Sequence, residues 1–435
     1  MTPRKVALDL LKKAEKSKQY SNIALDHALS ESGMSEQDRA LASALFYGVT
    51  ERKITLDYQL SRLSSRPLDS LENDVLCALR LGLYQLMYMD RIPNHAAINE
   101  TVALCSRKTS GFVNAILRAF TRQGEAPLPC REDSLCEYLS VAYSVLPAIC
   151  HKLISVYGDR DAERILMGIG CIPPTTLRVN TLKTTRDELL RHIDGALPTK
   201  SSPVGLHVKG AVRELYGFEE GYFFVQDEAS QICVEALGAV EGDTMLDICA
   251  CPGSKSFGSA IRMNNKGQIT AFDLHERKLS LIESSAQRLG INIIGTRAHD
   301  GRVFISELEG RARRVLCDVP CSGFGVLAKK PELRYKDPKE SAALPKIQRD
   351  ILENASRYVA EDGVLVYSTC TVFPEENEEN VRAFLKCHPE FHLEPFSVGE
   401  INATEGMITF FPSAEYPIDG FFIAKLVKGG RNGDN

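Results

Sequence analysis

The sequence predicts a multidomain protein with an all-α N-terminal domain, a small α/β connector and a C-terminal α/β domain built on a mostly parallel, doubly wound sheet. Three observations support this fold class. The chain of 435 residues is long enough for two or three domains of ordinary size. Apolar residues recur at helical spacing over about the first 120 residues. After about residue 240, short apolar strands alternate with helices, a pattern typical of a parallel sheet with helices on both faces.

The helical domain is predicted to comprise residues 1–125. Its apolar positions repeat every three or four residues, as in helices that bury one face against a bundle core. Helix starts are expected at Ser35, which is followed by acidic residues, and at Asn94, which follows a proline. The glycine and prolines of the stretch 123–129 interrupt any helix, so we place a domain boundary there.

Two further parts follow this boundary. Residues 130–240 combine helical periodicity with an extended run at 176–180 and predict a small α/β connector. Residues 241–428 contain the alternating strands and helices of the C-terminal domain. The expected strands are 244–249, 268–272, 315–318 and 364–368, with a final pair at 408–411 and 421–426. Most should be parallel and buried, with ligands bound at their carboxyl ends.

Composition limits the possible partners and compartments. Lys and Arg number 52 against 57 Asp and Glu, a net charge of −5, so overall charge does not favour a nucleic-acid partner, although one basic cleft can still bind a polyanion. No stretch approaches the roughly 18 consecutive apolar residues of a membrane span. The 13 cysteines form no disulfide framework, and the start of the chain resembles no secretory signal. We expect a cytoplasmic protein that does not enter a membrane.

The strongest local motif is a turn of small residues between the first strand of the C-terminal domain and the following helix. It comprises Cys249, Ala250, Cys251, Pro252, Gly253, Ser254 and Lys255. Such a turn lets a ligand approach the backbone and a helix N-terminus. A P-loop would need glycine directly before Lys255, and the glycines do not have the spacing of the dinucleotide fingerprint. Both of those nucleotide-binding motifs are therefore excluded.

Acidic residues follow the next two strands. Asp273 closes the second strand, where a carboxylate suits hydrogen bonds to ribose hydroxyls, and Asp300 follows the third, where it could reach an adenine amino group. A pocket rimmed by carboxylates favours a nucleoside without phosphates. S-adenosylmethionine is such a ligand.

Two cysteines lie just beyond the ends of the fourth and fifth strands. Cys321 follows Asp318, and Cys370 follows Tyr-Ser-Thr. Ligand clefts of open α/β sheets lie at these strand ends, and a thiolate is a good nucleophile where its surroundings lower its pKa from about 8.5. The pairs Cys249-x-Cys251 and Cys317-x3-Cys321 could belong to a zinc site, but no His or Cys pair with finger or ribbon spacing accompanies them, so we expect no metal.

Together these motifs resemble the Nol/Nop/Sun family of RNA cytosine-C5 methyltransferases. The resemblance covers nearly the whole chain, and the N-terminal helices are similar to a NusB-type RNA-binding domain, which is typical of the bacterial 16S rRNA enzymes of the family. Its most specific blocks are Asp-Val-Pro-Cys-Ser-Gly at 318–323, Tyr-Ser-Thr-Cys at 367–370, Gln-Asp-Glu-Ala-Ser at 226–230 and Asp-Gly-Phe-Phe at 419–422. Ser254 stands where the family usually has glycine, and its small side chain is compatible with a close turn.

The resemblance implies a Rossmann-like class I methyltransferase domain that methylates C5 of a specific cytosine in a single-stranded or loop region of 16S rRNA. Cys370 would add to C6 of the base and Cys321 would assist release, with Asp318 near the base or the methionine end of the cofactor. Residues 249–255, Asp273 and Asp300 would bind S-adenosylmethionine. Basic residues near Cys321 and one tyrosine among them would contact RNA phosphates; they are Lys329, Lys330, Arg334, Tyr335 and Lys336.

Three alternatives remain open at this point. The substrate could be a tRNA or another RNA. The reaction could be DNA cytosine-C5 methylation, in which Cys321 of the Pro-Cys pair would be the nucleophile, although the block that ends at Cys370 and the NusB-like domain argue against DNA. The chain could also be an RNA-binding assembly factor without catalysis, against which the presence of all the reactive residues argues.

Overall fold

The computed structural model describes residues 2–17, 22–171, 173–413, 415–416 and 418–429. The chain forms two compact units. Unit 1 comprises Met1–Leu166 and Lys330–Asp337, and unit 2 comprises Met167–Lys329 and Pro338–Asn435. The division into residues 1–125, 130–240 and 241–428 stays a prediction. Among the described residues, no helix is long and apolar enough to cross a membrane.

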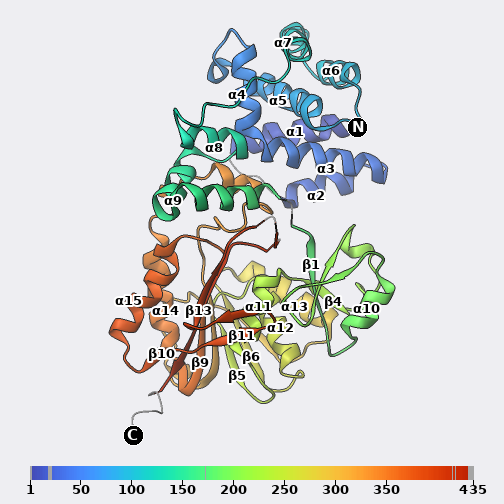
Figure 1. The fold of residues 1–435 in the computed structure, drawn as a ribbon. Coiled ribbons are helices and arrows are strands. Elements are labelled where there is room, and N and C mark those ends of the chain that lie inside the picture. The colour runs from blue at the N-terminus through green and yellow to red at the C-terminus, as the bar shows by residue number, and fades with distance from the viewer. Residues whose placement is uncertain (1, 18–21, 172, 414, 417, 430–435) are drawn as a thin grey trace. The chain divides into compact units, whose positions relative to one another are not determined.

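Unit 1 is built from helices, coloured blue to green in Figure 1. They are α1 (Pro3–Ser17), α2 (Asn22–Glu31), α3 (Glu36–Glu51), α4 (Lys53–Leu63), α5 (Asn73–Tyr88), α6 (Asn94–Ala103), α7 (Ser110–Gln123), α8 (Leu135–Tyr143) and most of α9 (Pro147–Gly170). Apolar side chains from α3, α4, α5 and α7, such as Leu45, Leu56 and Leu117, form a buried core. Ser35 caps α3 and α6 begins at Asn94, so both predicted helix starts are confirmed.

A short 3₁₀ helix, η4 (Pro331–Tyr335), also belongs to unit 1 and packs on α3. Arg334 is buried, and its guanidinium donates hydrogen bonds to the carbonyl oxygens of Glu51 (3.3 Å) and Tyr143 (3.4 Å). The Tyr335 hydroxyl donates to the Thr50 carbonyl oxygen at 2.5 Å. The prediction that Arg334 and Tyr335 contact RNA phosphates is therefore wrong, because both side chains satisfy backbone groups inside the unit.

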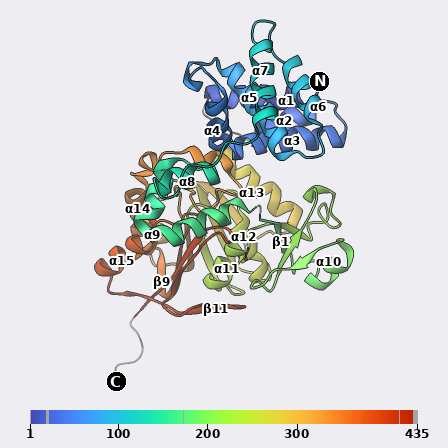
Figure 2. The same cartoon turned by 45° about the horizontal axis from the view of Figure 1, so that its top comes forward.

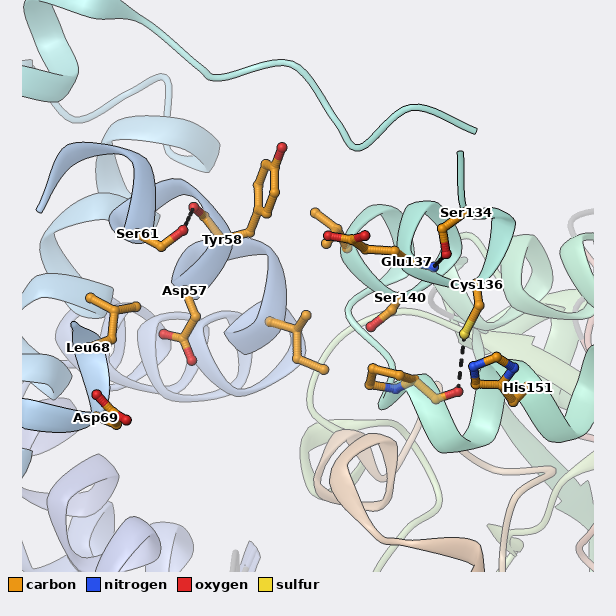
Figure 3. A pocket seen from close by; sticks show the side chains of 13 residues that line it. Asp57, Tyr58, Ser61, Leu68, Asp69, Ser134, Cys136, Glu137, Ser140 and His151 are labelled. Carbon is orange, nitrogen blue, oxygen red and sulfur yellow. Dashed lines mark hydrogen bonds between the residues drawn. The ribbon is translucent and has the colours of Figure 1, made fainter. Parts of the chain in front are cut away.

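Unit 1 also contains a cavity of about 740 Å³ between α4 and the α8–α9 pair (Figure 3). Carboxylates of Asp57, Asp69 and Glu137 line it together with apolar side chains. The Asp57 carboxylate accepts two hydrogen bonds from the Arg80 guanidinium, at 2.6 and 2.7 Å. Carboxylates repel phosphates, so the lining of this cavity does not favour RNA binding. No residue of the predicted site lies in it.

Unit 2 contains, among the described residues, a sheet of eight strands in the order β10-β14-β9-β8-β5-β6-β7, with β13 beside β14. The parallel strands are β5 (Thr244–Asp247), β6 (Gln268–Asp273), β7 (Ile294–Ala298), β8 (Ala312–Asp318) and β9 (Val359–Thr369). Antiparallel neighbours follow at one edge; they are β14 (Phe421–Lys428), β10 (Phe391–Leu393) and β13 (Met407–Phe410). The prediction of a mostly parallel, doubly wound sheet is confirmed.

Helices cover both faces of this sheet. Alternate strand residues explain why: Met245 and Leu316 point into one apolar core, and Leu246 and Val315 into the other. The first core is closed by α11 (Glu228–Leu237), α12 (Ser254–Arg262) and α13 (Glu276–Leu289), the second by α14 (Leu344–Ser356) and α15 (Glu378–Cys387). Burial on both faces is what makes these strands near-continuous apolar runs. The chain crosses from β7 back to β8 on the other side of β5, so a ligand crevice is expected at the carboxyl ends of these strands.

A smaller antiparallel sheet with strand order β2-β3-β1-β4 precedes the large one in the chain. Its strands are β1 (Thr175–Val179), β2 (Leu197–Pro198), β3 (Gly205–Val208) and β4 (Phe223–Val225). The predicted extended run at 176–180 lies in β1. In both views α10 (Arg186–His192) lies beside this sheet (Figures 1 and 2).

Candidate functional site

The small-residue turn joins β5 to α12 and is held by the neighbouring strand. The N–H of Ala250 donates to the Phe272 carbonyl oxygen (2.7 Å), and the N–H of Cys251 donates to Oδ2 of Asp273 (3.3 Å). Gly253 has φ +105°, and a Cβ there would lie 2.5 Å from the Phe257 ring. This position therefore requires glycine, and the backbone stays open at the start of α12.

Asp247, at the end of β5, is buried at 1% exposure. Its Oδ2 accepts a hydrogen bond from the Ser256 hydroxyl (2.6 Å), whereas its Oδ1 is buried without a hydrogen-bond partner among the described residues. Burial raises the pKa of Asp247 to about 7, and the nearby Asp318 carboxylate adds to the shift. A buried carboxylate oxygen without a donor is a position that a ligand N–H can fill. Sequence reasoning missed Asp247, although it stands two residues before Cys249, the first residue of the turn.

The two carboxylates predicted to bind the nucleoside lie at the ends of β6 and β7. Oδ1 of Asp273 accepts from the N–H of His275 (3.0 Å). Asp300 is engaged more fully, because the Arg302 guanidinium donates to both of its oxygens, at 3.0 and 2.6 Å. The Arg302 hydrogen bonds lower the pKa of Asp300 to about 2.

On the other side of β5, Lys255 reaches Asp318 at the end of β8. The Lys255 ammonium donates to Oδ2 of Asp318 (2.6 Å), and the Ser368 hydroxyl donates to Oδ1 (2.8 Å). Burial by itself would lower the pKa of Lys255, but the Asp318 carboxylate outweighs burial and the pKa is raised. Lys255 is therefore a charged group inside the site.

The two predicted cysteines lie against each other. Their Sγ atoms are 3.1 Å apart, and the N–H of Cys370 donates to Sγ of Cys321 (3.2 Å). The hydrogen bond with Cys370 and then burial raise the pKa of Cys321 well above its usual range. Both sulfur atoms are thiols and are not part of a disulfide. The sequence predicts two cysteines at adjacent strand ends, and the structure places them within hydrogen-bond distance.

A buried layer supports these cysteines from α14 and from η6 (Pro374–Glu376). Oε2 of Glu376 accepts hydrogen bonds from the N–H of Ser322 (2.9 Å) and from the Gln348 side chain (2.8 Å). The Thr369 hydroxyl donates to Oδ1 of Asn377 (2.5 Å). Gln348 has no sequence signal, since a single glutamine within an amphipathic helix looks like a surface residue.

Lys329 does not point to solvent as a phosphate-binding lysine would. Its ammonium donates to Oδ2 of Asp227 (2.6 Å) and Oδ2 of Asp419 (2.8 Å). The prediction that Lys329 contacts RNA phosphate is therefore wrong, because its ammonium is already paired with two carboxylates of unit 2.

The residues at the carboxyl ends of β5, β6 and β8 fit S-adenosylmethionine. Carboxylates suit its sulfonium and ammonium charges and its ribose hydroxyls, and the unpartnered Oδ1 of Asp247 can accept an N–H. Gly253 has no side chain to cover the backbone of the turn, and the ammonium of Lys255, which ends the turn, is paired with the Asp318 carboxylate. In the described part of the chain, no group of three or more His, Cys, Asp and Glu side chains could hold a metal ion.

Comparison with known proteins identifies the family. Residues 234–427 match the model of the family described as 16S rRNA methyltransferase RsmB/F, and residues 1–122 match the NusB family. The probable ribosomal RNA small subunit methyltransferase B of Bacillus subtilis (strain 168) is 37% identical over 446 residues, which cover 98% of this chain and 99% of that protein. The chain belongs to the RsmB/F family. It is therefore an S-adenosylmethionine-dependent methyltransferase with a NusB-like N-terminal part, and an RNA substrate follows from the family.

Other relatives agree with this assignment. Ribosomal RNA small subunit methyltransferase B of Citrobacter koseri is 33% identical and covers 91% of the chain and 92% of its own length. The crystal structure of PH0851 has a TM-score of 0.80 at 26% identity and covers 98% of this chain and 99% of its own. NSun6 from Pyrococcus horikoshii, crystallised with SFG, has a TM-score of 0.57 at 23% identity over 65% of this chain and 98% of its own, which supports the fold.

Proposed function

We propose that this RsmB/F protein methylates C5 of a cytosine in 16S rRNA through a covalent adduct between Cys370 and C6 of the base. The contact between the Cys321 and Cys370 sulfur atoms, 3.1 Å apart beside the Lys255–Asp318 pair, is the observation that carries the proposal. The names of the relatives support a small-subunit rRNA target, and the SFG bound to NSun6, an analogue of S-adenosylmethionine, supports the cofactor.

The chemistry explains why a thiol is needed. C5 of cytosine is a weak nucleophile, but addition of the Cys370 thiolate to C6 converts C5 into an enamine carbon that can attack an electrophile. S-adenosylmethionine, when bound, supplies the electrophilic methyl group. Residues 249–255, Asp273 and Asp300 would hold the cofactor. The Asp318 carboxylate would accept hydrogen bonds from the amino group or the protonated N3 of the base.

Cys321 would act on release. Its pKa lies well above the usual range, so it stays protonated beside the nucleophile. After methyl transfer, the proton on C5 must leave and the bond between Cys370 and C6 must break. Cys321 lies within hydrogen-bond distance of the departing sulfur, so it can give that sulfur its proton and accept the C5 proton in exchange.

The substrate must present an unstacked base. Extrusion of a base into a cleft costs a few kcal/mol and is easiest in a loop or single strand. We therefore propose a single-stranded or loop region of 16S rRNA as the target, with no role for DNA. We expect the reaction in the cytoplasm, a reducing compartment in which free thiols persist.

Trapping with 5-azacytidine RNA tests the assignment of the two cysteines. Cys370→Ala should abolish both the covalent adduct and methylation. Cys321→Ala should still be trapped by 5-azacytidine RNA, and on RNA with ordinary cytosine it should release the product slowly, so that the covalent adduct accumulates. If Cys321→Ala abolished trapping and Cys370→Ala kept it, the nucleophile would be Cys321 and the roles would be reversed.

Bisulfite sequencing of rRNA and tRNA from a deletion strain tests the substrate. One cytosine of 16S rRNA should lose its methylation, and the wild-type gene, but not the Cys370→Ala gene, should restore it. Loss of a tRNA or 23S position in its place would redirect the proposal to another RNA. An unchanged map together with no binding of S-adenosylmethionine in calorimetry would favour an assembly factor without catalysis.

A further inference from the structure

Two sequence blocks of the family resemblance have no part in the proposed chemistry. One contains Asp227, directly before α11, and the other contains Asp419, two residues before the start of β14. They lie far apart along the chain, and Lys329 connects them, since its ammonium binds one carboxylate oxygen of each at 2.6 and 2.8 Å. All three residues belong to unit 2.

Both carboxylates are fixed by their surroundings. Oδ1 of Asp227 caps α11 by accepting from the N–H of Ala229 (3.0 Å). Asp419 is buried, which raises its pKa to about 7 with a further contribution from Asp227. Burial acts to lower the pKa of Lys329, but Asp227 and Asp419 outweigh it and the pKa is raised. The ammonium is therefore charged and held between two anchored groups, unlike a surface lysine that exchanges its partners with water.

Lys329 ends the segment that starts at Cys321, here called the Cys321 loop (residues 321–329). In the middle of this loop the N–H of Gly325 donates to the Cys370 carbonyl oxygen (3.0 Å), and the Gly420 N–H donates to the Gly325 carbonyl oxygen (2.8 Å). The backbones touch at this point, because a Cβ at Gly420 would lie 2.6 Å from Cα of Gly325. The loop is thus packed between the Cys370 end of β9 and the start of β14.

We propose that Lys329 is a positioning residue: by binding Asp227 and Asp419 it holds the Cys321 loop against β9 and β14, and so keeps Sγ of Cys321 at hydrogen-bond distance from Sγ of Cys370. The effect on methylation rests on the proposed function, whereas the distance between the two sulfur atoms does not. A phosphate-binding lysine at this position would instead set the affinity for RNA and its salt dependence.

The sulfur distance can be measured without RNA or cofactor by using dibromobimane, in which each of two thiolates displaces one bromide to give a bridged product. Peptide mass spectrometry then identifies the bridge between Cys321 and Cys370. In the full-length Lys329→Met variant, bridging should slow at least about fivefold, while single alkylation by monobromobimane should not slow. Lys329→Arg keeps a cation between the carboxylates and should restore bridging to within about twofold of the wild type.

Lys266→Met is the matched control, since Lys266 pairs with Glu241 at the surface of the same unit. It should leave bridging and methylation unchanged. Because Lys329→Met leaves two buried carboxylates without a cation, a triple variant with Asp227→Asn and Asp419→Asn removes the three charges together and favours folding. The triple variant should melt close to the wild type yet bridge as slowly as Lys329→Met. Bridging at the wild-type rate in either folded variant would overturn the proposal.

The kinetics of RNA methylation distinguish a positioning role of Lys329 from a role in RNA binding. For Lys329→Met we expect kcat to fall about tenfold or more, with KM for RNA changed less than about threefold, because a small misplacement of reacting groups lowers the rate more than the affinity. A rise of KM alone, with a weaker salt dependence, would show phosphate contact and overturn the proposal. If the wild type bridges its cysteines but methylates no RNA, the proposed function fails and the bridging comparison still decides the role of Lys329.

Discussion

The two halves of the site hold their groups in different ways. On the β5–β6–β7 side, the partners are closer in sequence: Asp300 binds Arg302 two residues away, Asp247 binds Ser256 nine residues away, and Asp273 binds Cys251 22 residues away. On the β8–β9 side, the partners are distant. Asp318 binds Lys255 across 63 residues, Cys321 contacts Cys370 across 49, and Ser322 binds Glu376 across 54.

This difference matches what each half must do. A cofactor can be held by groups on short turns, because small shifts of a carboxylate can be absorbed by a flexible ligand. A sulfur atom that must meet C6 of a base tolerates little displacement, since the rate falls steeply with misplacement of the reacting atoms. Buried groups from several elements fix such a position better than a turn does. Substitutions in the two halves of the site should therefore impair the protein in different ways.

The largest effect on stability is expected at Asp247, the one fully buried carboxylate of the cofactor side. Its pKa of about 7 in the folded chain is above the 3.8 of an ordinary aspartate, so its contribution to stability is full below pH 3.8 and is lost as the pH rises to 7. Asp247→Asn removes this loss. The free energy of unfolding of the variant, relative to the wild type, should rise by up to about 4 kcal/mol between pH 4 and 7.

Urea unfolding followed by circular dichroism at several pH values measures this difference. Asp194→Asn, a change at an exposed aspartate, should give a difference that does not vary with pH. A flat profile for Asp247→Asn as well would mean that Asp247 has the same pKa in the folded and unfolded chains, and that its unpartnered oxygen is solvated.

The next effect is expected at Glu376, in the layer under the cysteines. Glu376→Ala leaves the Ser322 N–H and the Gln348 side chain without their shared acceptor in a buried place. We expect a loss of about 3 kcal/mol in the free energy of unfolding and a fall in methylation at full occupancy of RNA. Glu379→Ala, at an exposed position in the first turn of α15, should change both by little. Equal effects of the two variants would show that the layer does not support the Cys321 loop.

A smaller effect is expected at Gly253, in the cofactor turn. Gly253→Ala must adopt φ +105° and also meets the Phe257 ring at 2.5 Å, whereas Gly242→Ala must adopt φ +87° with no atom within 4 Å. Both variants should lose about 1–2 kcal/mol from the backbone. Gly253→Ala alone should weaken S-adenosylmethionine binding about tenfold in calorimetry, because the turn must shift. If both variants bind the cofactor equally, the turn does not contact it.

The sequence predicted the parts of this molecule that depend on local patterns. Buried parallel strands are apolar runs, so the sequence predicts β5, β6, β8 and β9. It also predicts a cysteine at the ends of two adjacent strands, although it does not predict their contact. The sequence predicts a third strand before Asp300 but gives no range for it, because β7 lies at an edge of the sheet and is largely exposed, without an apolar run.

The parts that depend on distant contacts were not predicted. Nothing near Lys329 in sequence indicates that its partners are Asp227 and Asp419, so a basic residue near a catalytic loop looked like a phosphate ligand. The burial of Arg334 could not be predicted either, because its hydrogen-bond acceptors are carbonyl oxygens of α3 and α8, which are distant in sequence. Charge alone does not distinguish a residue that binds RNA from one that joins two elements of the fold.

The smallest effect is expected at Asp300, on the cofactor side of the site. Its carboxylate is partly exposed and already bound by the exposed Arg302, so the pair contributes little to stability. If Asp300 accepts a hydrogen bond from the adenine amino group, the ligand must compete with Arg302. Asp300→Asn should then weaken cofactor binding about twofold to fivefold, and Arg302→Ala should strengthen it about twofold, as measured by calorimetry. Changes of opposite sign in the cofactor affinities of the two variants would support contact between Asp300 and adenine. Weaker binding in both variants would mean that Arg302 shapes the turn after β7. Asp300 would then bind the cofactor only in the orientation that Arg302 gives it.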